Sequence, residues 1–122
     1  MSAFWLFSGG ALGSVVAVVH AVLGQRLILR QVSGLSAVGK RVLLAVFHLS
    51  SLYWALAGLL MMWLALAAPK EHVRPLGIVV MVIYLSRAIG NFWATRGRHF
   101  GWVLLTVCGA LVGAGVFGLT RG

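Results

Sequence analysis

Residues 42–68, VLLAVFHLSSLYWALAGLLMMWLALAA, form the stretch that decides the fold. These 27 residues contain no charged side chain and are interrupted by little more than His48 and a pair of serines. A soluble helix keeps a polar face toward water, and this stretch has none. A bilayer core about 30 Å thick requires roughly 20 apolar residues at about 1.5 Å each. The sequence therefore predicts a helix that crosses a membrane with length to spare.

Three further apolar runs surround this stretch, at residues 3–24, 76–95 and 100–120. The polar residues from Pro69 to Pro75 indicate a short turn before the third run, and residues 96–99 indicate a tight connection before the fourth. We therefore predict an all-α fold, a four-helix transmembrane bundle with antiparallel, up-down-up-down helices. The chain 1–122 is expected to form a single integral membrane domain in which the last two spans are a hairpin.

The composition excludes a soluble globular domain. Hydrophobic residues make up 61% of the chain and charged residues 9%, whereas about 25% is usual for charged residues in soluble domains. The net charge of +9 comes from ten Lys and Arg residues against one acid, Glu71. These basic residues flank the apolar runs, where they meet anionic lipid headgroups. The predicted partner is therefore the lipid bilayer and not nucleic acid, and the lone Cys108 rules out an internal disulfide.

The basic residues also predict an orientation. Cytoplasmic loops carry more Lys and Arg than loops on the other side. One side holds six basic residues and the other three: Arg26, Arg30, Lys40, Arg41, Arg96 and Arg98 against Lys70, Arg74 and Arg121. The N-terminal run lacks a basic n-region and is too long for a signal peptide, so it is expected to stay as the first span. We predict a multi-pass protein of the bacterial inner (plasma) membrane with both termini outside the cytoplasm.

Several ionisable side chains are predicted at depth in the cytoplasmic half of the membrane. His20 precedes Arg26 by six residues and His48 follows Arg41 by seven, which places both roughly 9–11 Å inside the boundary. Arg87 lies about 13 Å deep by the same reasoning, and His99 enters the fourth span from the same side. Each shares a helix face with small or polar residues, and such groups usually face the bundle interior.

These positions define the candidate site. The predicted cofactor-binding or ligand-binding residues are His20, His48, Arg87, Tyr84 and Asn91. The predicted metal ligands are His20, His48 and His99. Arg87 has no acid within the spans, so it requires carbonyls, Tyr84, Asn91, a lipid phosphate or a bound anion, or else it extends toward the headgroups.

The candidate site residues are chemically compatible with several kinds of ligand. Neutral imidazoles bind transition metals and haem iron, and two from facing helices can hold haem b while Arg87 or Arg41 neutralises the propionates. A pair of imidazoles beside a cationic Arg can instead bind a quinone or a lipid headgroup. The alternative without a ligand is that the histidines have a structural role, as neutral hydrogen-bonding groups between helices.

Catalysis is disfavoured, because no span contains Asp or Glu and no Ser–His–acid set can be built. The leading hypothesis is a non-catalytic membrane protein with an intramembrane histidine site for haem b, a metal or a quinone-like ligand. The alternative is an accessory or assembly subunit of a larger membrane complex, or a homo-oligomer, docked through its Gly and Ala faces. A channel or transporter is the least favoured class, since the spans have almost no charge to line a pore.

The segments VVHAVLGQRLILR, FHLSSLYWALAGLL and RHFGWVLL resemble a family of small four-span bacterial inner-membrane proteins of unassigned function. The shared features are a first-span His-x-x-x-Gly (His20 to Gly24) and a second-span His followed by Ser. Two positions depart from the pattern: Gln25 stands where an acid is common, and Phe47 stands where Trp often precedes the His. The resemblance implies a fold and a location, and it implies no activity.

Overall fold

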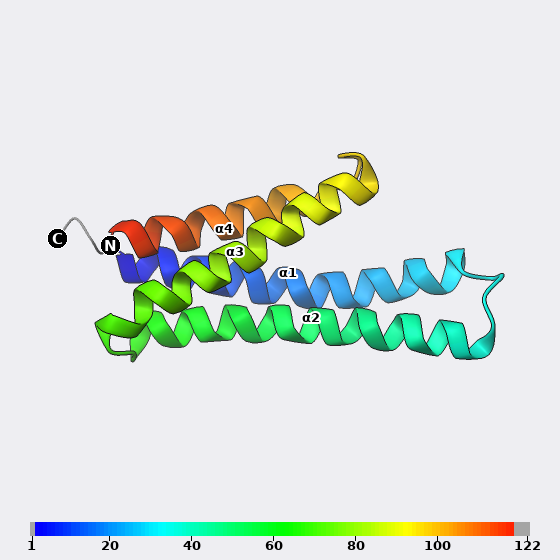
Figure 1. Cartoon of the computed structure of the whole chain (residues 1–122), viewed down its shortest axis with the longest axis horizontal. Helices are drawn as coiled ribbons and strands as arrows, with labels where there is room; N and C mark the ends of the chain where they lie inside the picture. Colours follow the sequence, from blue (N-terminus) through cyan, green and yellow to red (C-terminus); the bar gives the residue numbers. More distant parts are fainter. Residues whose placement is uncertain (1, 119–122) are drawn as a thin grey trace.

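A computed structural model describes residues 2–118, apart from the side chain of Ile28. Over these residues the chain forms the helices α1 (Ser2–Gln31), α2 (Ala37–Leu66), α3 (Lys70–Thr95) and α4 (Gly101–Gly118), without any β-strand. Successive helices run antiparallel (Figure 1), so the predicted all-α, up-down-up-down bundle is confirmed. Each of these helices is long and apolar enough to cross a membrane. The predicted end of the fourth span at residue 120, and Arg121, lie outside the described residues.

Helix α3 begins earlier than predicted. Residues 70–75 were expected to form a turn, and this interpretation is wrong, because they form the first turns of α3 with Pro75 inside the helix. The N–H groups of a first helical turn need no partner within the helix, so polar residues are readily placed there. Glu71 lies in this first turn, where a negative charge interacts favourably with the helix dipole. Only Pro69 remains outside the helix, as its N-terminal cap.

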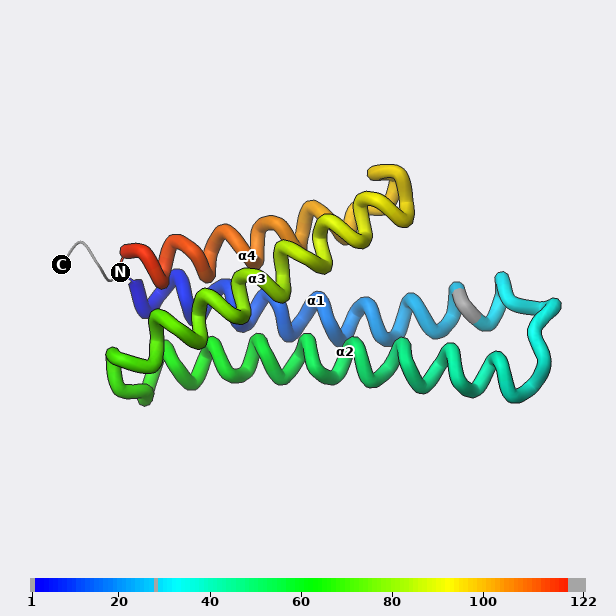
Figure 2. The backbone as a smooth tube through the Cα atoms, in the orientation of Figure 1, coloured from blue at the N-terminus to red at the C-terminus, as the bar shows by residue number. Residues whose placement is uncertain are grey.

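Helices α1 and α2 form the longer hairpin. Both contain 30 residues, which corresponds to about 45 Å. They run side by side along their length and extend beyond the turn between α3 and α4 (Figure 2). Gly10 and Gly58 allow the close approach, since a Cβ atom added to either one would lie 2.5 Å from the carbonyl oxygen of the other. Next to this contact, the Ser14 hydroxyl donates a hydrogen bond to the Ala55 carbonyl at 3.2 Å.

Helices α3 and α4 form the shorter hairpin, as the sequence predicted. Arg96 and Gly97 have φ values of 53° and 73°, the left-handed backbone that ends α3. The Gly97 N–H donates to the Phe92 carbonyl at 2.9 Å. The Trp102 indole N–H then donates to the Gly97 carbonyl at 3.2 Å, which ties the start of α4 to the turn.

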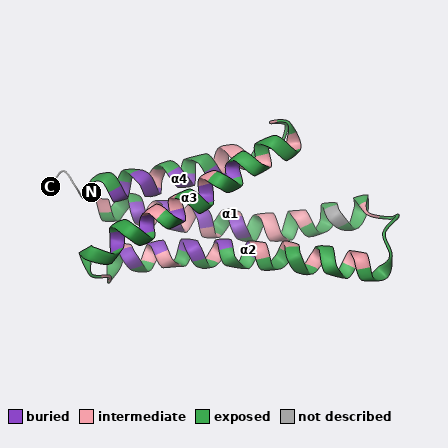
Figure 3. Ribbon diagram, in the orientation of Figure 1, coloured by how far each residue is buried: buried purple, intermediate pink, exposed green. Residues whose placement is uncertain are grey.

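The two hairpins meet at one end of the molecule and diverge at the other. Helix α4 packs along α1, whereas α3 approaches α2 closely only near the short connection between them (Figure 1). Buried residues gather at the end where the helices meet (Figure 3). The fully buried side chains of this core include Leu6, Met61, Val80, Tyr84, Cys108, Val112 and Val116.

The outer surface is strongly apolar. Large hydrophobic side chains are exposed around the bundle, among them Val18, Val46, Leu66 and Ile89. Contiguous apolar surface of this extent marks a site of contact with membrane or protein. Together with the apolar length of the helices, it describes a multi-pass membrane protein.

Candidate functional site

A polar cavity of about 180 Å³ lies where the two hairpins begin to diverge. Every helix of the described chain contributes to its wall. The lining residues are His20 from α1, Trp54 from α2, Ser86, Arg87, Gly90 and Asn91 from α3, and Leu105 from α4. Three residues of the candidate site, His20, Arg87 and Asn91, are therefore brought together.

An apolar cavity of about 220 Å³ adjoins the first one and shares four wall residues with it: His20, Trp54, Asn91 and Leu105. It extends between α1 and α4, where its other lining residues include Leu23, Leu27, Phe100 and Leu104. We call the two cavities together the hairpin cleft. One end of the hairpin cleft is polar and the other is apolar.

The ring of His20 is held by two aromatic side chains of α2. Its centroid lies 4.7 Å from that of Phe47 and 5.5 Å from that of Trp54. Phe47 fits there because Gly24 has no side chain, and a Cβ atom at Gly24 would collide with the Phe47 ring. Phe47 and Trp54 are seven residues apart, so they share one face of α2. The two helices thus fix the position of the imidazole.

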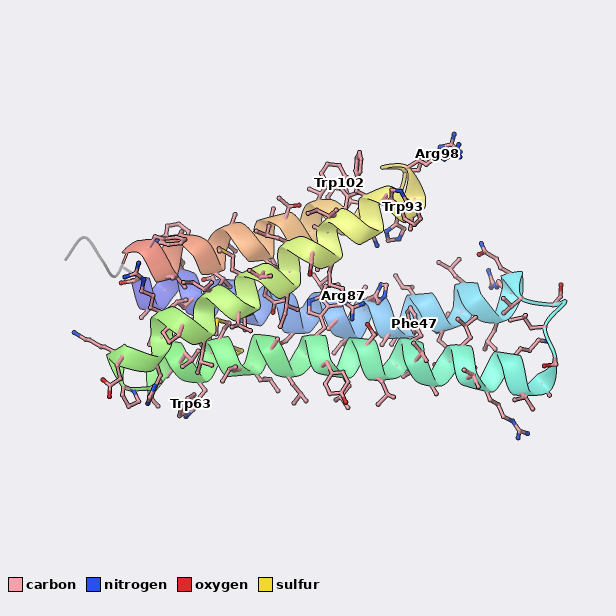
Figure 4. All side chains as sticks on the ribbon, viewed as in Figure 1. Phe47, Trp63, Arg87, Trp93, Arg98 and Trp102 are labelled. Atoms are coloured by element: carbon pink, nitrogen blue, oxygen red, sulfur yellow. The ribbon has the colours of Figure 1, made fainter. Side chains whose placement is uncertain are left out.

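Arg87 projects into the space between α3 and the pair formed by α1 and α2 (Figure 4). Within residues 2–118, its guanidinium forms no hydrogen bond and no ion pair. The only acid of the chain, Glu71, lies 16 residues earlier on α3, about 24 Å along the helix. The charge of Arg87 is therefore not compensated by any carboxylate side chain.

Two further polar atoms belong to side chains that line the hairpin cleft. Trp54 Nε1 and Asn91 Oδ1 are buried and have no hydrogen-bond partner in the described part of the chain. Buried polar groups in proteins are nearly always hydrogen-bonded, often through water or a ligand. The two residues line the hairpin cleft, which places an unpartnered indole donor and an unpartnered amide acceptor at its wall.

His99 lies at the margin of the apolar cavity, and its Nδ1 accepts a hydrogen bond from the Gly101 N–H at 3.1 Å. The N–H groups of a first helical turn lack intrahelical partners, so this contact caps α4. His99 therefore has a structural role, and only its Nε2 is free for a ligand.

This capping role gives a prediction. Replacing His99 by alanine is expected to lower the free energy of unfolding by about 1 kcal/mol, the usual value of a helix cap. His99→Asn should retain most of the stability, because its Oδ1 takes the place of Nδ1 as acceptor. Reversible unfolding in mixed micelles, followed by circular dichroism, measures both variants. Equal losses in the two variants would contradict a capping role.

His48 does not line the hairpin cleft, and this corrects the expectation that it shares a pocket with His20. It is exposed and lines a separate groove of about 230 Å³ with residues of α1 and α2 that include Ala17, Ala21 and Ser51. The reason is angular, since neighbouring residues lie about 100° apart around a helix and Phe47 takes the direction that faces His20. The described residues also contain no group of three His, Cys, Asp or Glu side chains that could hold a metal.

Tyr84 also lies outside the hairpin cleft. Its side chain is fully buried in the core, where the hydroxyl group packs against Gly13. That hydroxyl has no hydrogen-bond partner among residues 2–118. Tyr84 thus serves as packing between α3 and α1, next to Trp54 at a ring distance of 6.5 Å.

Sequence reasoning did not single out Trp54 or Leu105 as site residues. Trp54 lies two helical turns from Phe47 on the same side of α2, but nothing in the sequence shows that this side faces His20. Leu105 carried no signal either, since a leucine in an apolar helix has no mark of the face it occupies.

No protein-family model, curated protein or solved structure matches this chain. The resemblance to a family of four-span bacterial proteins therefore stays a prediction. What the chain itself establishes is a four-helix bundle of membrane-spanning length, with a cleft between its two hairpins.

Proposed function

We propose that this chain is a non-catalytic membrane protein that binds an amphipathic ligand, quinone-like or lipid-like, in the hairpin cleft. The observation that carries the proposal is the polarity of the cleft. A cation without a counter-ion and two unpartnered polar atoms lie at one end, and an apolar cavity adjoins them. An amphipathic molecule has the same division between head and tail.

The polar end offers groups that suit an oxygen-rich head. Arg87 supplies several N–H donors, and the Trp54 indole supplies one more. The Asn91 amide combines donors with an acceptor, and His20 adds a ring that donates or accepts according to its tautomer. Carbonyl or phosphate oxygens of a ligand can satisfy these groups, which otherwise lack partners.

The apolar end suits a hydrocarbon tail. Leu23, Leu27 and Phe100 line the cavity and are also exposed on the outer surface. In a bilayer this surface faces acyl chains, so a tail can pass between α1 and α4 without leaving an apolar environment. We infer that the ligand reaches the cleft laterally from the membrane.

Haem and metal binding receive less support than an amphipathic ligand. A bis-imidazole haem site would draw on His20 and His48, which line different cavities. His99 has one ring nitrogen engaged by the backbone of α4. A single imidazole, His20, is then available in the polar cavity.

We also propose an orientation and a location. The loop between α1 and α2 and the turn between α3 and α4 lie at the same end of the molecule (Figure 1). Six of the ten Lys and Arg residues lie toward this end, in the α3–α4 turn and in the adjoining ends of α1 and α2, which supports a cytoplasmic position for this end and both termini on the opposite side. A bacterial inner membrane, and membership of the four-span family that the chain resembles, complete this proposal.

The second candidate is an accessory subunit of a larger complex or a homo-oligomer. The observation that favours it is the position of His48, a polar side chain on the outer surface beside Ala17, Ala21 and Ser51. Polar side chains facing lipid are unfavourable, and small residues allow a second helix to approach. Co-purification of a stoichiometric membrane partner that is lost in His48→Leu, with no ligand in the cleft, would favour this candidate.

The variant Gly90→Leu tests the binding function. Gly90 lines the polar cavity, and a Cβ atom at this position meets no other atom within 4 Å, so a leucine can enter the cavity without disturbing the packing. We expect the amount of amphiphile retained after purification to fall about tenfold or more, as measured by native mass spectrometry.

The matched control is Val82→Leu, an exposed position of α3 that does not line the hairpin cleft. It should retain the ligand at the level of the unmodified protein. Undiminished retention in Gly90→Leu would contradict the proposal, as would an unmodified protein that retains no quinone or lipid after reconstitution.

A further inference from the structure

We propose that the head group bound in the hairpin cleft is anionic, a phosphate ester carried on a lipid. This inference rests on the proposed binding of an amphiphile and names the chemistry of its polar end. The observation that separates an anionic head from a neutral one is the charge of Arg87.

Arg87 is a permanent cation within a membrane-spanning helix, and no carboxylate side chain lies near it. A charged side chain at membrane depth is unfavourable unless it is paired or hydrated. A neutral quinone accepts hydrogen bonds from a guanidinium but leaves its charge uncompensated. A phosphate accepts these hydrogen bonds and also compensates the positive charge. Two of its oxygens match the two parallel N–H groups of the guanidinium in a bidentate arrangement.

The surroundings of the hairpin cleft add to this preference. Basic side chains of the α3–α4 turn and of the adjoining ends of α1 and α2 lie toward the same end of the molecule: Arg26, Arg30, Lys40, Arg41 and Arg96. Glu71, the sole acid, lies near the opposite end of α3. Like charges around a cavity of low dielectric raise its potential, which attracts an anion and repels a cation.

The same charges argue against a zwitterionic lipid. Phosphatidylcholine carries a phosphate, but its quaternary ammonium group also needs a partner. The hairpin cleft offers no carboxylate to that group, because the residues that line it include neither Asp nor Glu. Trp54 contributes an indole to the wall of the polar cavity, and the N–H of this indole has no acceptor in the described part of the chain. An anionic head without a cationic group therefore fits best.

The adjoining apolar cavity distinguishes a lipid phosphate from a free one. Both would use Arg87 and Asn91 at the polar end. Only a lipid also fills the space between Leu23 and Leu104, and this burial of apolar surface adds to its affinity.

The experiment compares phosphatidic acid with phosphatidylcholine of identical acyl chains, added to the full-length protein in neutral detergent and counted by native mass spectrometry. The unmodified protein should bind phosphatidic acid about tenfold more tightly. Arg87→Gln should abolish this preference, and Arg87→Lys should restore part of it, because lysine keeps the charge without the fork. Arg98→Gln is the matched control, since Arg98 points away from the bundle at the turn (Figure 4).

Inorganic phosphate and glycerol 3-phosphate serve as competitors that lack a tail. Failure of millimolar competitor to displace phosphatidic acid supports a lipid as the ligand, and displacement of the bound lipid at that concentration overturns the requirement for a tail. Equal affinity for the two lipids, or an equal loss in Arg98→Gln and Arg87→Gln, overturns the anionic head group. Tight binding of a neutral quinone that is unaffected by Arg87→Gln would overturn this inference while leaving the proposed function intact. Binding of no amphiphile would remove both.

Discussion

Replacing Tyr84 by alanine is expected to lower the free energy of unfolding by about 3–5 kcal/mol. Tyr84 is the largest of the fully buried side chains and joins α3 to α1 over Gly13. Its removal leaves a void that the close-packed helices around it cannot fill, because the neighbouring side chains are already in contact. Reversible unfolding in mixed micelles with increasing sodium dodecyl sulfate measures the change.

Tyr84→Phe is the matched control for this prediction. The hydroxyl group of Tyr84 is buried without a partner in the described chain, so its removal should leave the stability unchanged or slightly higher. Lipid binding should also persist in Tyr84→Phe, since the side chain does not line the hairpin cleft. A loss of lipid binding in this variant, at normal stability, would mean that Tyr84 is part of the binding site.

The second large effect is expected for Gly58→Leu, with a loss of about 3 kcal/mol in the free energy of unfolding. A side chain at this position would press against the backbone of Gly10 and against the Ser14 hydroxyl group. Helices α1 and α2 would have to move apart along the hairpin, which would also break the hydrogen bond from Ser14 to Ala55.

The same substitution at Gly90 provides the comparison. Nothing lies within 4 Å of a Cβ atom there, so Gly90→Leu should unfold like the unmodified protein although it fills part of the cleft. Similar unfolding curves for Gly58→Leu and Gly90→Leu would mean that α1 and α2 do not pack through these glycines. Gly58→Leu therefore reports on the stability of the bundle, and Gly90→Leu reports on binding in the cleft.

The helices could be predicted because the physical signal was strong. Apolar runs of membrane-spanning length mark where the helices lie in the sequence. The short polar segment around Arg96 and Gly97 allows only a tight turn between the last two spans. The error at residues 70–75 arose because prolines and charges were both taken as signs of a turn. Charges are readily placed in a first helical turn, where the N–H groups need no acceptor, and Pro75, the sixth residue of α3, removes only the one hydrogen bond to the Glu71 carbonyl.

The depth of the site residues in the membrane could be predicted from the sequence, but the direction in which each side chain points from its helix could not. A rise of 1.5 Å per residue places His20 and Arg87 at similar levels, and the structure brings these two together. The same reasoning put His48 at that level, but depth does not fix the angle around the helix. A helix that is apolar on every side has no polar stripe from which the angle can be inferred. In the structure it is Phe47, and not His48, that points toward His20. Only the packing of Phe47 against Gly24 reveals this direction.

The most direct test of the central claim, a ligand-binding cleft between the hairpins, is the fluorescence of Trp54. In a variant that keeps only this tryptophan, phosphatidic acid with brominated chains should quench the emission in a saturable way at a low mole fraction in phosphatidylcholine. Gly90→Leu should remove the saturable component. In a variant that keeps only Trp63, which points outward from α2 (Figure 4), quenching should rise in proportion to the brominated lipid. Proportional quenching of Trp54, indistinguishable from that of Trp63, would contradict the account.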